Sequence, residues 1–352
     1  MTASRDRMPG LDALRGVAAL MVLLFHTRGL VLPNAVLSHG YLAVDLFFVI
    51  SGVVLARAHD AQLAAGGGRD FMQRRLIRLY PMVLLGLGLG AAVMLAAGRD
   101  PATVALLAVL GVLFVPFTGA TDIFPLNGPQ WSLLWELAVN LLYAAIAPWL
   151  TLRRLILLTV LGGVLHTILA LRFGTGSLGP LAGDWWGGAP RVVFGFFAGV
   201  LLARLLERGR LTIPAPPIWV HLAILVAILT APIPAAGRAA FDLVGVLVVF
   251  PLLVGSAARA EVGGLRPLLD GLAAISYALY ALHIPLLWAA TEIVGRGVLP
   301  GVPKVVIGGA ALIIALLAAL AAHRGFEPWA ARRLRGVGAQ PRSTSLPSSS
   351  TR

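Results

Sequence analysis

Long apolar runs alternate with short clusters of Gly, Pro and Arg along almost the whole chain. A helix that spans the hydrocarbon core of a bilayer needs about 20 largely apolar residues. The pattern predicts an all-α, polytopic bundle of transmembrane helices built from eleven candidate segments, separated by turn-forming residues. These segments lie at residues 11–30, 41–57, 77–97, 102–117, 131–150, 155–172, 188–206, 217–231, 239–258, 271–291 and 304–322.

Composition supports a membrane protein and narrows its chemistry. Of the 352 residues, 59% are hydrophobic and 12% are charged, whereas soluble domains carry about twice that share of charge. The absence of cysteine excludes disulfides, thiolate nucleophiles and cysteine-based metal sites, and we expect no metal. The net charge of +13 would suit nucleic acid, but the basic residues are not gathered into one soluble patch, so no nucleic-acid partner is expected.

The arginines indicate how many segments cross, because cytoplasmic loops carry most of the Lys and Arg. If all eleven crossed, Arg153, Arg154 and the basic C-terminal stretch would lie outside. Segment 102–117 is short and runs into a Pro- and Gly-rich loop, so we expect it to lie flat or to re-enter without crossing. About ten spans then place twenty basic residues at cytoplasmic sites and seven outside. Both termini are accordingly expected in the cytoplasm.

The two ends of the chain carry their own expectations. No small-residue cleavage site follows the first apolar run, so the first helix is expected to remain as an anchor. We expect a multi-pass protein of a bacterial inner (cytoplasmic) membrane, surrounded by membrane lipid. Residues 1–335 are predicted to form one transmembrane domain, and the polar, Ser- and Pro-rich residues 336–352 a disordered tail.

The first segment sets Arg15 and His26 eleven residues apart inside an apolar helix. Eleven residues make about three full turns, so both side chains share one face and lie about 16 Å apart along the axis. Ionisable residues within a membrane helix usually mark a functional site, which is the interpretation we favour. The structural alternative pairs Arg15 with Asp12 and lets His26 hydrogen-bond a neighbouring helix.

Two further groups of polar residues leave two interpretations open. Asp45 in the second segment could pair with a nearby arginine or orient His26. Arg75 and Arg78 are three residues apart and so share one helix side at the cytoplasmic membrane surface. Arginines fork onto phosphate oxygens, which would suit an anionic nucleotide such as coenzyme A. Anionic lipid headgroups also explain arginines at this level, and these two residues alone favour that explanation.

The fifth segment carries a polar stripe on an otherwise apolar helix. Ser132, Glu136, Asn140 and Tyr143 recur at helical spacing. A glutamate inside the membrane must be paired or face water. We therefore interpret the stripe as the lining of a cavity.

Two later segments add polar residues at membrane depth. Tyr280 and His283 share a face with Ser276, and Pro285 removes the hydrogen bond to the Ala281 carbonyl, which should kink the helix. Arg191 is expected near the outer surface, where it would line the cavity or snorkel from an interfacial belt. A tunnel is predicted, with His26, Glu136 and Arg191 toward the outer half. Arg75 and Arg78 would lie at its cytoplasmic mouth, and His283 between the two groups.

Taken in order along the chain, these elements resemble the membrane-bound acyltransferase-3 family. Five motifs match: a basic residue, ten residues and histidine at Arg15 and His26; FFxxSG at 47–52; RxxR with a following proline at 75–81; WSLxxE at 131–136; and SYxxYxxH at 276–283. A closing E-x-P-like element departs slightly, as Glu327-Pro328 without the spacer. The resemblance runs from about residue 8 to 335 and is to a stand-alone member, without the SGNH-hydrolase-like domain that many members carry.

The resemblance implies an O-acyltransferase. Such an enzyme moves an acyl group, most commonly acetyl, from cytoplasmic acyl-CoA to a hydroxyl of a cell-envelope saccharide, lipid-linked sugar or related metabolite. Arg75 and Arg78 would hold the nucleotide phosphates, and His26 would act as general base or carry the acyl group. Glu136 would orient the imidazole or position the acceptor, and Arg15 would stabilise an oxyanion or bind phosphates.

The remaining site residues are predicted to line the path of the substrates: Asp45, Ser132, Arg191, Tyr280 and His283. A transporter or flippase of an envelope precursor is the alternative function, because it needs the same intramembrane charges. A non-catalytic scaffold of an envelope-assembly complex is a third. A homo-oligomer or a separate envelope partner would be compatible with each of these functions.

Overall fold

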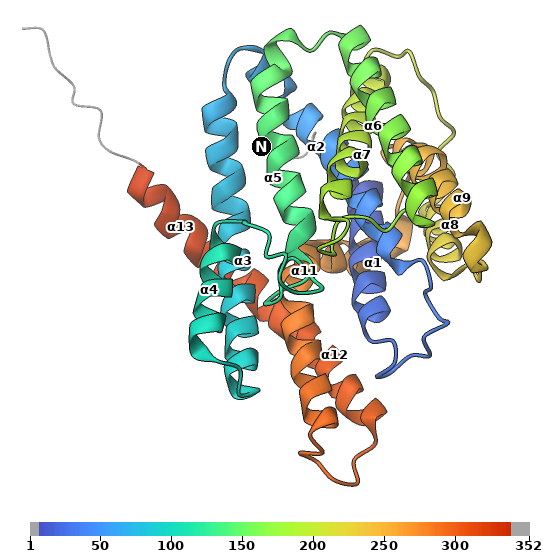
Figure 1. Cartoon of the computed structure of the whole chain (residues 1–352). Coiled ribbons are helices and arrows are strands. Elements are labelled where there is room, and N and C mark those ends of the chain that lie inside the picture. Colours follow the sequence, from blue (N-terminus) through green and yellow to red (C-terminus); the bar gives the residue numbers. More distant parts are fainter. Residues whose placement is uncertain (1–6, 339–352) are drawn as a thin grey trace, which may run out of the picture.

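The computed structural model describes residues 7–338, and in this part of the chain all regular structure is helical (Figure 1). The predicted all-α bundle is confirmed. The helices are α1 (Pro9–His26), α2 (Ala43–Ala64), α3 (Gly68–Ala96), α4 (Pro101–Val112), α5 (Gln130–Ile146), α6 (Leu152–Phe173), α7 (Gly188–Glu207), α8 (Ile218–Thr230), α9 (Arg238–Val244), α10 (Phe250–Ala257), α11 (Arg266–Gly295), α12 (Lys304–Ala321) and α13 (Glu327–Gly338). The predicted tail starts inside α13, and its residues 339–352 lie outside the described part.

Within residues 7–338, nine helical segments are long and apolar enough to cross a membrane, while α4 and α8 are shorter. The 13 residues of α8 rise about 20 Å, less than the hydrocarbon core of about 30 Å. The amide of Ile218, its first residue, nevertheless bonds the Glu261 carbonyl before α11, and Leu229 near its end accepts from the His39 amide before α2. Because these loops lie at opposite ends of the bundle, α8 supplies the tenth pass of the chain.

The two ends of the bundle differ in the side chains that their loops carry. We call the end at which α1 begins the basic end; ion pairs Arg7–Asp270 and Arg57–Glu207 lie there. We call the end at which α1 finishes the far end. The loop before α12 belongs to it, because Lys304 donates a hydrogen bond to the Gly29 carbonyl just after α1 (2.9 Å).

Helices α1 and α11 run parallel and in register. Gly16 of α1 lies against Ala273 of α11, and His26 lies against His283, so the offset in residue number is 257 at both contacts. A Cβ atom on Gly16 would crowd the Ala273 backbone, so the glycine permits this close approach. The register places the histidines of two helices at the same depth.

The segment that was expected not to cross forms a short helix and a returning loop. The side chain of Asp100 caps α4 by accepting from the Thr103 amide (2.8 Å), which lowers the pKa of this carboxyl. The loop 113–129 then turns back into the bundle, where Asn127 is buried and donates to the Ala281 carbonyl (2.9 Å). Pro285 leaves this carbonyl without its helical partner, so a side chain from the returning loop replaces the missing amide.

A buried ion pair joins α2 to α7. Arg191 donates to both carboxylate oxygens of Asp45 at 2.7 Å and to the carbonyls of Leu178 and Tyr41, and both charged side chains are 1% exposed. Glycines in the same pair of helices allow close contact, because a Cβ at Gly52 would overlap the backbone of α7. The arginine is thus buried inside the bundle and does not snorkel to an interfacial belt.

Removal of one partner of the Arg191–Asp45 pair should leave the other as an unpaired buried charge. We expect Arg191→Met to destabilise the protein by about 3–5 kcal/mol, and Asp45→Asn combined with Arg191→Met to recover part of that loss. The measurement is the thermal midpoint in detergent, by size-exclusion chromatography of heated samples. Arg172→Met, at an exposed arginine of α6, is the matched control. Equal thermal midpoints for Arg191→Met and Arg172→Met would contradict a stabilising role of the buried ion pair.

Candidate active site

Arginines of two helices and a glutamate of a third gather near the basic end. Arg75 of α3 is buried and forms an ion pair and hydrogen bond with Glu136 of α5. Their side chains are only 10% and 18% exposed, so the interaction is little screened by solvent. Glu136 was expected in the outer half beside His26; it lies instead with the arginines, because Arg75 is its partner.

The other two arginines of this cluster differ in their partners. Arg15 donates to Asp12 at 2.8 Å, one turn earlier in α1, as the structural alternative proposed. Arg78 is exposed and lies within electrostatic range of Arg15 and Arg75. Among the described residues it has no carboxylate partner within ion-pair distance. The cluster therefore keeps one uncompensated positive charge, which suits a phosphate group.

Two tyrosines of α11 continue inward from the arginine cluster. Tyr277 lies within electrostatic range of Glu136 and Arg75, and its hydroxyl donates to the Leu79 carbonyl at 2.6 Å. One turn further, the Tyr280 hydroxyl lies 2.7 Å from the Ser132 hydroxyl of α5. Helix α11 therefore carries polar side chains from the basic end toward the middle of the bundle.

The polar row on α11 ends at a pair of histidines. His283 Nε2 lies 3.2 Å from His26 Nδ1, and the ring centroids are 4.9 Å apart. His283 is 1% exposed, whereas His26, the last residue of α1, is exposed. Six residues separate Tyr277 from His283, a rise of about 9 Å along α11. The pair thus lies about 9 Å further along α11 than Tyr277 and about 16 Å along α1 from Arg15.

Several residues that were predicted for the cavity have other contacts. Both oxygens of Asp45 are occupied by Arg191, so the arginine-partner interpretation is the one seen and Asp45 does not orient His26. Tyr143 donates to Asp60, which also pairs with Arg204 near the basic end.

Ser276 and Asn140, two further polar residues of the predicted cavity lining, make no hydrogen bond to the polar row on α11. The Ser276 hydroxyl bonds a carbonyl of its own helix. Asn140 is fully buried without a hydrogen-bond partner among residues 7–338.

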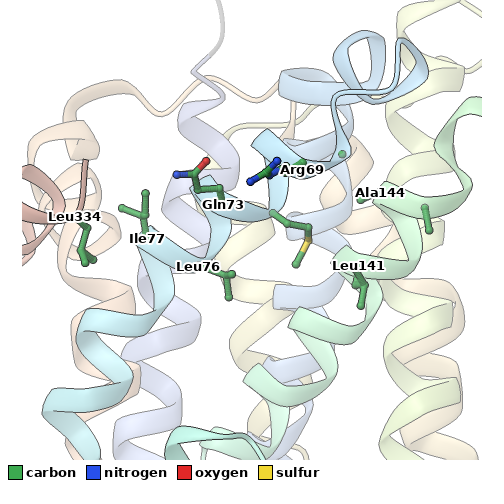
Figure 2. Close-up of a pocket in the computed structure, with 10 residues that line it drawn as sticks. Arg69, Gln73, Leu76, Ile77, Leu141, Ala144 and Leu334 are labelled. Carbon is green, nitrogen blue, oxygen red and sulfur yellow. The ribbon is translucent and has the colours of Figure 1, made fainter. Parts of the chain in front are cut away.

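A groove of about 730 Å³ lies on the other side of α3 (Figure 2). Figure 2 shows Leu76, Ile77, Leu141 and Leu334 along its wall, with Arg69 and Gln73 at one end. Helical spacing turns the lining residues of α3 away from Arg78 by about half a turn. We therefore assign the candidate active site to the row from the arginine cluster to the histidine pair, and not to this largely apolar groove.

Sequence reasoning missed several polar contacts of the bundle. Tyr277 stands inside the SYxxYxxH element, but its position next to Ser276 places it on another face. Asp242 is fully buried and accepts from Tyr41 (2.8 Å) and from the Gly176 amide (2.8 Å), and lies 2.9 Å from His39. No spacing in the sequence connects these distant residues. The described residues contain no group of three metal-binding side chains.

Comparisons with known proteins identify the family to which the chain belongs. A family profile described as an acyltransferase domain (Acyl_transf_3) matches residues 8–324. Protein 2 in the picA locus of Rhizobium radiobacter is 35% identical over 190 residues, which are 48% of this chain and 97% of that protein. BcsY of Komagataeibacter xylinus, provisionally named a membrane-bound transacylase, is 31% identical over 168 residues, 44% of this chain and 41% of that protein.

The O-acetyltransferase OatA of Staphylococcus aureus is 39% identical over 80 residues, 22% of this chain and 12% of that protein. No solved structure matches the chain significantly. The profile match extends over almost all of the described residues, and nine of their helical segments can cross a membrane. The chain therefore belongs to the acyltransferase-3 family and is a multi-pass membrane acyltransferase.

Proposed function

We propose that the protein is an O-acyltransferase of a bacterial inner membrane that uses acyl-CoA as its donor, with acetyl as the expected acyl group. The donor binds at the basic end, which faces the cytoplasm. The acceptor is a hydroxyl of a cell-envelope saccharide, lipid-linked sugar or related metabolite. Support for transfer to oxygen comes from the resemblance to OatA, whose name states that activity.

One observation carries this proposal. An exposed arginine without a carboxylate partner among the described residues, Arg78, lies within electrostatic range of Tyr277, where a row of polar side chains begins that ends at the exposed His26. This arrangement separates a site for anionic phosphates from a site for proton transfer. Acyl-CoA also keeps these two parts apart, because its charges lie on the nucleotide and its thioester lies at the end of an uncharged arm.

The position of Arg15 favours one of its two proposed roles. Arg15 lies eleven residues from His26, about 16 Å along α1. Its hydrogen-bond partner is Asp12, and Arg78 lies within electrostatic range. An oxyanion at the reacting carbonyl must lie within hydrogen-bond distance of its donor. We therefore assign Arg15 to the donor phosphates and not to the oxyanion.

The chemistry of transfer requires one proton acceptor near the acceptor hydroxyl. His26 takes the hydroxyl proton while the oxygen attacks the thioester carbonyl carbon. A C–O bond forms and the C–S bond breaks, and the leaving thiolate takes the proton back from the imidazolium. A covalent acyl-histidine achieves the same net transfer if His26 attacks first. Both routes need an unprotonated nitrogen of His26 that is open to substrate.

Removal of the histidine should abolish transfer without removing the protein from the membrane. We expect His26→Ala to lower the rate by about 10²–10⁴-fold, the usual contribution of a general base. The assay follows labelled acyl groups from acyl-CoA in membrane vesicles, corrected for the amount of inserted protein. His221→Ala is the control, because His221 is a histidine outside the candidate site, buried and bonded to Ser256 between α8 and α10. Full transfer by His26→Ala would refute the catalytic assignment.

The donor site predicts a selective change in substrate binding. We expect Arg78→Gln to raise KM for acyl-CoA by about 10-fold or more with little change in kcat, because a charge-assisted hydrogen bond contributes about 1.5–3 kcal/mol. Acyl-pantetheine, which lacks the nucleotide, should be used equally by the variant and the wild type. Arg69→Gln, on the groove side of the same helix, is the matched control. Equal KM changes in the two variants would argue for a general effect of charge at the basic end.

A further inference from the structure

The histidine pair contains enough hydrogen-bond information to assign its protons. His283 Nδ1 lies 3.0 Å from the Leu279 carbonyl and 2.9 Å from the Tyr280 carbonyl. Carbonyl oxygens only accept, so this nitrogen must carry a hydrogen. A neutral imidazole has one N–H group. The other nitrogen of His283, Nε2, is therefore a lone-pair acceptor, and it is the atom that faces His26.

The same reasoning applies to His26. Its Nδ1 lies 2.9 Å from the Val22 carbonyl and 3.2 Å from the acceptor nitrogen of His283. Both neighbours are acceptors, so His26 Nδ1 carries the hydrogen and Nε2 carries the lone pair. Within residues 7–338 no side chain or backbone group hydrogen-bonds this Nε2, and the residue is exposed. The reactive nitrogen is thus identified as Nε2.

We propose that His283 is a positioning residue for His26, a role that rests on the proposed catalytic function of His26. Its Nε2 shares the His26 Nδ1–H with the Val22 carbonyl, helps to fix the ring orientation, and holds the imidazolium when His26 takes a proton. Base-orienting groups in hydrolases do this with a carboxylate. A neutral imidazole does it here without adding a second charge inside the membrane. The role is the same whether His26 acts as base or as nucleophile, because both need the Nε2 lone pair.

The arrangement of α11 makes His283 suitable for this role. Its Nδ1 is anchored to the backbone of the preceding turn, and its side chain is almost completely buried. The parallel register with α1 sets the two rings at one depth. The ring therefore cannot turn to offer Nδ1 to His26 without breaking both backbone contacts.

The test compares two substitutions that differ in whether they retain an acceptor. We expect His283→Leu to lower kcat by about 10–100-fold, as loss of a ligand-orienting partner does in metal sites, with KM for acyl-CoA unchanged. His283→Gln should recover most of kcat, because its amide oxygen can accept from His26 Nδ1–H. Ser276→Ala, whose hydroxyl bonds only its own helix, is the control. Nitrogen-15 NMR of the membrane-embedded wild type should report hydrogen on Nδ1 and none on Nε2 of His26.

The outcomes separate this proposal from the function on which it rests. If His26→Ala retains transfer, the proposed function fails. If His26→Ala is inactive while His283→Leu keeps full kcat, only the role of His283 fails. Equal losses in the Leu and Gln variants, or a hydrogen on His26 Nε2 in the wild type, would overturn the positioning role. If the Leu variant does not fold, the Gln variant still decides: a kcat near that of the wild type supports the role, and a loss of about 10-fold or more overturns it.

Discussion

The structure depends on the pairing of polar groups inside an apolar bundle. Hydrocarbon offers no water to solvate a charge or a free hydrogen-bonding group, so such groups are stabilised by partners within the bundle, and three of these pairs join different helices. Arg191 and Asp45 join α7 to α2, Arg75 and Glu136 join α3 to α5, and His283 and His26 join α11 to α1. The first pair connects two helices deep inside the bundle, and the other two belong to the candidate site. Stability and chemistry thus arise from one constraint.

Backbone groups obey the same constraint where α11 is interrupted. Pro285 leaves the Ala281 carbonyl without a helical donor, and Asn127 from the returning loop donates to it. Gly86 of α3 provides the space, because a Cβ there would collide with the Asn127 amide and this carbonyl. Helix α11 consequently remains continuous from Arg266 to Gly295 although it contains a proline. The returning loop therefore supports the helix that carries His283.

Much of the fold could be predicted because hydrophobic length and charge bias are local properties of the sequence. The helical segments, the short α4 and the same-face placement of Tyr280 and His283 follow from such patterns. The partners could not be predicted, since helical spacing gives the face and depth of a residue but not the helix opposite. Asp45 fitted two partners equally well, and Glu136 was placed at the wrong depth because the returning loop starts α5 inside the bundle. Tyr277 was missed because it shares no face with Ser276.

The site combines fixed helices with one residue that is open to substrate. Catalytic groups act best when rotamers and neighbouring hydrogen bonds hold them in place. His283 is held by two carbonyls of its own helix, and the Gly16 contact keeps that helix against α1. His26 is exposed at the last position of α1, and in the proposed mechanism it meets the acceptor from the far end. The arginines proposed to bind the donor lie on α1 and α3, nearer the basic end. The proposed mechanism therefore brings the two substrates to one histidine from opposite sides.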